Sequence, residues 1–176
     1  PAVALAGPRA VASPPLRRYI GGEPMFDVLV YLFENCAAFR ACRDADSITR
    51  RLAEAGFDVD EITDAIAWLR DLDQVTSDNI ALRAPTDSAF RVYAGFETSR
   101  LTPRGIAFLA FLEAEGQLTP TQREIVIERA LAVREVPVSL AKLKVTVLMV
   151  LWSQQADIDA LMLEELLDDG ADREVH

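Results

Sequence analysis

The chain has 176 residues, of which 51% are hydrophobic, and a formal net charge of −10. This length suits one domain, or two small domains that share a core. Phosphate neutralisation supplies most non-specific nucleic-acid affinity, so an acidic chain disfavours DNA or RNA as a partner without excluding a local basic patch. The longest apolar run, residues 145–152, is far shorter than the roughly 20 residues that cross a bilayer, so we expect no membrane segment.

Residues 1–24 contain scattered prolines and arginines and lack the continuous apolar segment of a signal peptide. We expect them to form a disordered leader that is not part of the native fold. Cys36 and Cys42 have no histidine or third cysteine near them, so neither a disulfide framework nor a zinc site is predicted. Two reduced thiols are typical of a cytoplasmic protein, which is the location we expect.

Helical spacing of apolar residues dominates the first part of the chain. A helix over residues 26–38 is apolar on most sides and must be covered from two directions. A short helix over 46–55 follows, with Gly56 placed as its C-cap, and a third helix spans about 58–71. The apolar face of this third helix comprises Val59, Ile62, Ile66 and Leu69.

A hairpin is expected where the helical pattern stops, between residues 76 and 101. Residues 80–83 and 89–93 are predicted as two short antiparallel strands, joined by a turn at 85–88. Helix, short helix, helix and hairpin is the order of a winged helix. One interpretation of residues 25–101 is therefore a winged-helix-like unit.

Four helices are expected in the C-terminal half, over about 102–116, 119–134, 139–152 and 157–168. Serine or threonine precedes the first three as an N-cap, twice with proline at the first helical position. The predicted fold class is mainly α with a small antiparallel β-hairpin, in which the N-terminal half packs on a C-terminal helical bundle, residues 102–170. The tail 171–176 is expected to fray.

No group of residues predicts catalysis. The only histidine is the terminal His176, and neither a nucleophile-elbow motif nor a glycine-rich phosphate loop occurs. The acidic residues that open the third helix lack the glycine of a calcium loop and suit the positive end of the helix dipole. They are Asp58, Asp60, Glu61 and Asp64. We therefore predict no enzyme, no catalytic or metal-binding residue and no cofactor.

Glu124 and Glu128 lie one helical turn apart, and paired carboxylates can perform acid–base chemistry. Arg123 and Arg129 stand beside them. The flanking arginines indicate surface ion pairs instead.

Two sets of residues are candidates for interaction. Trp68 lies at the border of the apolar face of the third helix, which suits a protein interface as well as a core position. The candidate protein interface comprises Trp68, Glu61, Asp64 and Leu72. A basic alternative surrounds the hairpin and would track a nucleic-acid backbone, although arginines that balance an acidic surface explain it too. It comprises Arg83, Arg91, Arg100 and Arg104.

Several separated blocks resemble one bacterial family in their order and spacing. They are residues 25–35, 55–57, 65–69, 91–93, 104–113, 123–129, 143–144 and 147–151, with Ile62, Glu97, Leu101 and Leu140 between them. From Met25 to about Gln155 the chain resembles the Smg family, small proteins without an established biochemical role. None of the blocks is a catalytic signature.

We therefore predict a non-catalytic cytoplasmic interaction or adaptor protein with an unknown protein partner, and the sequence does not predict its oligomeric state. The alternative is a winged-helix regulator that binds nucleic acid through the hairpin arginines. Its third helix would carry five carboxylates against one arginine, a net charge of −4, which disfavours contact with phosphates.

Overall fold

The computed structural model describes residues 24–35, 45–81, 91–156, 158 and 160–167, and the structural statements below refer to these residues. Outside them lie residues 1–23 of the predicted leader, both cysteines, Arg83 and the predicted frayed tail. The described helices are α1 (Pro24–Glu34), α3 (Ala45–Glu54), α4 (Val59–Ala81), α5 (Gly95–Arg100), α6 (Pro103–Ala114), α7 (Pro120–Leu131), α8 (Leu140–Ser153) and α9 (Ala160–Leu167).

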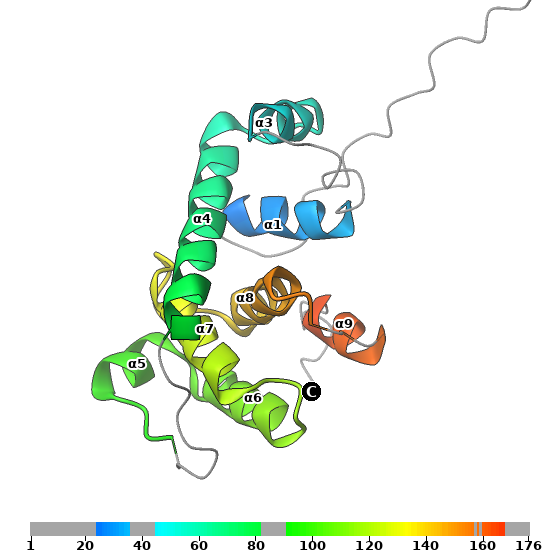
Figure 1. Ribbon diagram of the computed structural model, residues 1–176. Helices are drawn as coiled ribbons and strands as arrows, with labels where there is room; N and C mark the ends of the chain where they lie inside the picture. The colour runs from blue at the N-terminus through cyan, green and yellow to red at the C-terminus, as the bar shows by residue number, and fades with distance from the viewer. Residues whose placement is uncertain (1–23, 36–44, 82–90, 157, 159, 168–176) are drawn as a thin grey trace, which may run out of the picture.

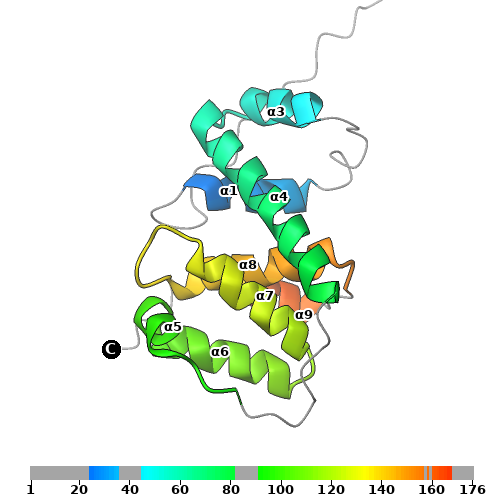
Figure 2. The same ribbon diagram turned by 60° about the vertical axis from the view of Figure 1, so that its left-hand side comes forward.

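Helix α8 lies at the centre of the fold, where it contacts α1, α6, α7 and α9. In Figure 1, α4 runs along one side of the molecule past α1 and α7, and α3 packs near its N-terminal end. Figure 2 shows α8 between α1 on one side and the layer formed by α6 and α7 on the other. Every residue of α8 from Lys142 to Leu151 is buried.

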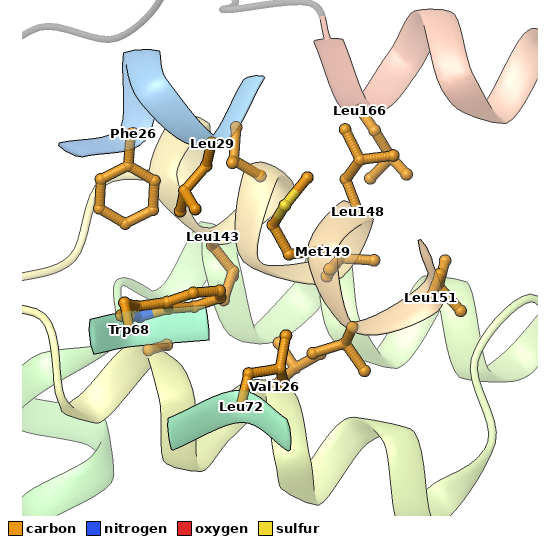
Figure 3. Close-up of a cluster of buried hydrophobic side chains, with 14 of the residues drawn as sticks. Phe26, Leu29, Trp68, Leu72, Val126, Leu143, Leu148, Met149, Leu151 and Leu166 are labelled. Carbon is orange, nitrogen blue, oxygen red and sulfur yellow. The ribbon is translucent and has the colours of Figure 1, made fainter. Parts of the chain in front are cut away.

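The core forms where α1 and α4 meet α7 and α8. Phe26 and Leu29 of α1 lie over Leu143 of α8, and Trp68 and Leu72 of α4 approach from another direction (Figure 3). Burying one such side chain contributes roughly 1.5–3 kcal/mol relative to leaving it in water. Because α1 packs on both α4 and α8, its nearly continuous apolar surface is covered from two directions, as the sequence predicted.

The helix boundaries follow local signals in the sequence. The hydroxyls of Thr102, Thr119 and Ser139 each accept a hydrogen bond from the backbone N–H three residues further on, which satisfies a donor that the helix itself leaves unpaired. Gly56 and Gly116 follow the last turns of α3 and α6 with φ angles of 94° and 72°, a conformation that glycine adopts without strain.

The predicted β-hairpin is wrong. Ile80 and Ala81, expected in its first strand, belong to the last turn of α4, which continues well past the predicted end at Asp71. The described residues contain no β-strand, and their β-type pairing is an isolated bridge between Leu101 and Val138. Without the hairpin, the winged-helix interpretation loses the wing on which it rested. The division of the chain near residue 101 stays a prediction.

The physical reason is that nothing in the sequence ends α4 where the prediction ended it. No glycine or proline occurs between Gly56 and Pro85, and these are the residues that stop helices most strongly. A side-chain hydrogen bond of 3.0 Å between Gln74 and Asp78, one turn apart, lies in the extension. The β-branched residues of this stretch carry only a weak strand preference, which packing overrides.

A second difference concerns α5, which occupies Gly95–Arg100 where no helix was predicted. Its first turn is held by Glu97, whose side chain accepts a hydrogen bond of 2.7 Å from the backbone N–H of Ala94. No helix among the described residues has the length and apolar character needed to cross a membrane.

Candidate protein-interaction cleft

Three of the four predicted interface residues line one cleft. It has a volume of about 420 Å³ and lies between the start of α1, the first half of α4, and the end of α7 with the residues that follow it. Glu61, Asp64 and Trp68 contribute to its wall. The fourth residue, Leu72, is 1% exposed and lies in the core instead.

The sequence of α4 explains why these side chains meet. Asp60, Asp64 and Trp68 follow one another at intervals of four residues, and Asp71 comes three residues later, so all four lie along one face of the helix. The neighbouring face carries the core residues of α4. The carboxylates of Asp60, Asp64 and Asp71 are exposed, whereas Trp68 at the boundary between the faces is buried.

Trp68 is a core residue that also borders the cleft. It is 6% exposed, and in Figure 3 its ring lies beneath Phe26 and Leu143. Its indole Nε1 is buried and donates no hydrogen bond. Most buried polar atoms are paired, so an unpaired indole N–H beside a cleft marks a position where an acceptor is missing.

Arg129 of α7 lines the same cleft, and its side chain also lacks a hydrogen-bond acceptor. It is 5% exposed, and its guanidinium carbon lies 5.6 Å from the centre of the Trp68 ring. Nη1 is 3.6 Å from the Asp71 carboxylate, which is beyond hydrogen-bond distance. Nε is buried without a partner, and Arg129 donates no hydrogen bond to any described acceptor. A buried guanidinium is therefore left with a cation–π contact and one long ion pair.

Arg123 lies on the same helix and is equally buried, at 6% exposure, but its hydrogen bonds are made within the chain. Its Nη1 donates to both carboxylate oxygens of Glu113, at 2.6 and 2.5 Å, and its Nε donates to Glu124 at 2.9 Å. Burial alone would lower the pKa of Arg123, but the hydrogen bonds to Glu113 and Glu124 raise it above its ordinary value. Its charge is thus compensated within the chain.

Arg91 completes this arrangement. Its guanidinium donates to Glu97 at 2.9 and 2.6 Å and to Glu124 at 3.1 and 3.0 Å, and it stacks over the Tyr93 ring at 4.7 Å. Hydrogen bonding to Glu97 and Glu124 raises the pKa of Arg91, and the same bond to Arg91 lowers the pKa of Glu97. We call Arg91, Glu97, Glu113, Arg123 and Glu124 the ion network. It fastens α5 and the residues before it to α6 and α7.

The arginines proposed for nucleic acid are dispersed or already held. Arg91 belongs to the ion network, and Nη2 of Arg100 donates to the backbone carbonyl of Val133. Arg104 is exposed in the first turn of α6. Arg83 lies outside the described residues. Arg91 and Arg100 therefore serve the fold, and their donors are not arranged around a free surface for phosphates.

Sequence reasoning missed Arg129 as a site residue. Arg123 and Arg129 form ion pairs as predicted, but both side chains are buried and do not lie on the surface. A signal was present: Arg129 follows Ile125 and Val126 at intervals of four and three, which places it on the apolar face of α7. Among the residues that the structure describes, no group of three histidine, cysteine, aspartate or glutamate side chains is placed to hold a metal ion.

Comparison with known proteins assigns the chain to a family. A family model described as "Protein of unknown function (DUF494)" matches residues 25–176. The "Protein Smg homolog" of Bordetella petrii is 51% identical over 152 residues, which cover 86% of this chain and all of the relative.

The chain belongs to the Smg family. The Smg homologue of Bordetella avium shows the same identity and coverage, and that of Aromatoleum aromaticum is 45% identical over 84% of this chain and 96% of its own length. No solved structure matches the chain. The family resemblance predicted from the sequence is confirmed, and the ion network lies within the blocks that carried it.

Substitution of Arg123 and Arg129 tests whether only Arg123 stabilises the fold. We expect Arg123→Met to lower the free energy of unfolding by about 1–3 kcal/mol, because it leaves the partly buried Glu113 carboxylate without its cation and Glu124 with Arg91 alone. Arg129→Met should change it by less than about 1 kcal/mol, or raise it, because an apolar side chain replaces a charge that has no hydrogen bond. Urea unfolding of both variants decides, and an equal loss for the two would contradict the distinction.

The ion network also predicts a pH dependence. The pKa of Glu97 is lowered below its ordinary value of 4.5, first by the hydrogen bond from Arg91. Its stabilisation is therefore complete above that value and is lost as the pH falls through the lowered pKa. Between pH 6 and pH 3, Glu97→Gln should lose about 1–2 kcal/mol less stability than the unaltered chain. Glu115→Gln, at an exposed position, is the control, and a loss in Glu97→Gln equal to that of the control would count against the network.

Proposed function

We propose that this Smg-family chain is a non-catalytic cytoplasmic interaction or adaptor protein whose partner protein docks in the cleft beside Trp68 and Arg129. The observation that carries the proposal is the buried side chain of Arg129, whose Nε has no hydrogen-bond acceptor in the chain. Leaving a buried polar group unpaired costs free energy, which a partner's acceptor offsets on binding.

The residue types in the cleft support a protein partner. Tryptophan and arginine are the side chains that most often dominate the binding energy of protein interfaces, and here one of each lies in a hollow. The exposed Asp60, Asp64 and Asp71 beside them repel polyanions. The described residues that line the cleft include no serine, cysteine or histidine to act as nucleophile or proton shuttle.

Site-specific photo-crosslinking in cells that produce the protein tests this proposal. Ala67 of α4 and Ala132, the residue after α7, are exposed and line the cleft from opposite sides, so a photoreactive side chain at either position leaves Trp68 and Arg129 intact. We expect both to give an adduct with the same partner protein. The matched control is Ala114, exposed at the end of α6 and away from the cleft. Absence of an adduct at the cleft positions, or the same adducts at Ala114, would refute the docking site.

A further inference from the structure

We infer that the segment docked in this cleft is a positively charged peptide that contributes one carboxylate to Arg129 and basic side chains to Asp60 and Asp64. The inference rests on the proposed function and specifies the chemistry of the occupant. The inference is supported by the two ends of the cleft, which would bind groups of opposite charge.

The inner end of the cleft presents hydrogen-bond donors without acceptors. Nε of Arg129 and Nε1 of Trp68 are both buried and unpaired, and the side chains that bear them are in contact. Hydrogen bonds between a guanidinium and a carboxylate are among the strongest in proteins, and arginine binds such a group through two parallel bonds. In this chain Arg91 already binds Glu97 in this way, through Nη1 and Nη2. Arg129 has the same requirement and no internal carboxylate that meets it.

The outer end of the cleft presents the opposite chemistry. Asp60 and Asp64 lie one turn apart on the exposed face of α4 and line the cleft. Two carboxylates at this spacing repel each other unless a cation lies between or beside them. A lysine or arginine side chain of the partner provides that cation.

The sum of charges around the cleft selects the sign of the whole ligand. The charged lining residues are Asp60, Glu61, Asp64, Asp71, Arg129 and Arg134. Four carboxylates against two guanidinium groups give −2, so a free anion such as phosphate, or an acidic peptide, meets net repulsion on the way to Arg129. A peptide with more basic than acidic residues overcomes this repulsion and still delivers its carboxylate.

The dimensions fix the spacing within the peptide. Asp64 and Asp71 are seven residues apart on α4, which corresponds to about 10 Å at 1.5 Å per residue. Asp71 marks the position of Arg129, since the two form an ion pair. An extended peptide advances roughly 3.3 Å per residue, so the basic side chain that meets Asp64 should lie about three positions from the acidic one. The volume of about 420 Å³ accommodates a few side chains of such a segment.

Selection of displayed random heptapeptides against the full chain tests the inference. Three variants are selected in parallel: Asp60→Asn with Asp64→Asn, Arg129→Lys, and Asp73→Asn as the matched control. Asp73 is exposed on α4 and does not line the cleft. Selected peptides are then synthesised and titrated in a Trp152→Phe background, where Trp68 is the remaining tryptophan and its fluorescence reports occupancy of the cleft.

We expect the enriched peptides to combine lysine or arginine with one aspartate or glutamate about three positions away. The double asparagine variant should weaken their binding about tenfold, because two exposed ion pairs are lost. Arg129→Lys should weaken it by about 30-fold or more, because lysine keeps the charge and loses the paired hydrogen bonds. Asp73→Asn should bind as the unaltered chain does.

Several results would overturn the inference. They are enrichment of acidic or purely apolar peptides, failure to enrich any sequence, and binding that neither cleft variant weakens. Displacement of the peptide by inorganic phosphate or free arginine at the same concentration as by the peptide itself would show a small-molecule site and would also overturn it. If photo-crosslinks at Ala67 and Ala132 persist alongside any of these results, the docking site stands and only the chemistry of the occupant is wrong. Loss of the crosslinks refutes the proposed function itself.

Discussion

A buried charge must find a counter-charge, and this requirement organises the structure around α8. Lys142 is fully buried and pairs with Glu135 while it stacks over the Phe26 ring. Lys144, two residues later, pairs with Glu165 at 2.6 Å. Removing an ammonium group from water costs several kcal/mol unless a carboxylate compensates it. The segment before α8 and helix α9 after it both supply such a carboxylate, so pairing reinforces the apolar packing that places them.

The ion network applies the same rule to α5, α6 and α7 and adds hydrogen bonds to each charge pair, whereas Arg129 has only an ion pair of 3.6 Å with Asp71. Arg129 lies six residues after Arg123 on α7 and is as buried, but its Nε has no hydrogen-bond acceptor. Proteins depart from local consistency mostly at functional sites, where stability is given up for binding. Arg129 lies in a cleft, beside a tryptophan with an unpaired N–H and below a row of aspartates. The exception and the cleft therefore support the same interpretation.

The sequence predicted those parts of the fold that depend on neighbouring residues. Thr102, Thr119 and Ser139 cap helices as expected, because a cap needs only the next three residues. The predicted hairpin is wrong because no glycine or proline before Pro85 ends α4, which continues through the first predicted strand. Local pattern also gave no sign of α5, whose first turn is held by Glu97.

The candidate site was predicted in part, since Glu61, Asp64 and Trp68 share a helix face that can be read from spacing. What makes it a site depends on contacts between distant segments. Arg91 and Glu124 are 33 residues apart in the chain, so the sequence does not show that Glu124 accepts hydrogen bonds from Arg91. Arg129 reaches Trp68 only because α7 packs on α4. No pattern within a single helix reveals which buried arginine lacks an acceptor.

The central claim is that Arg129 of the free protein donates no hydrogen bond to a carboxylate of its own chain. Nuclear magnetic resonance can measure how fast each guanidinium group rotates about its terminal C–N bonds, since hydrogen bonds to carboxylates slow that rotation. We predict slow rotation for Arg91 and Arg123 and clearly faster rotation for Arg129. Rotation of Arg129 as slow as that of Arg123 would show that an acceptor within the chain already holds it, and would contradict the account.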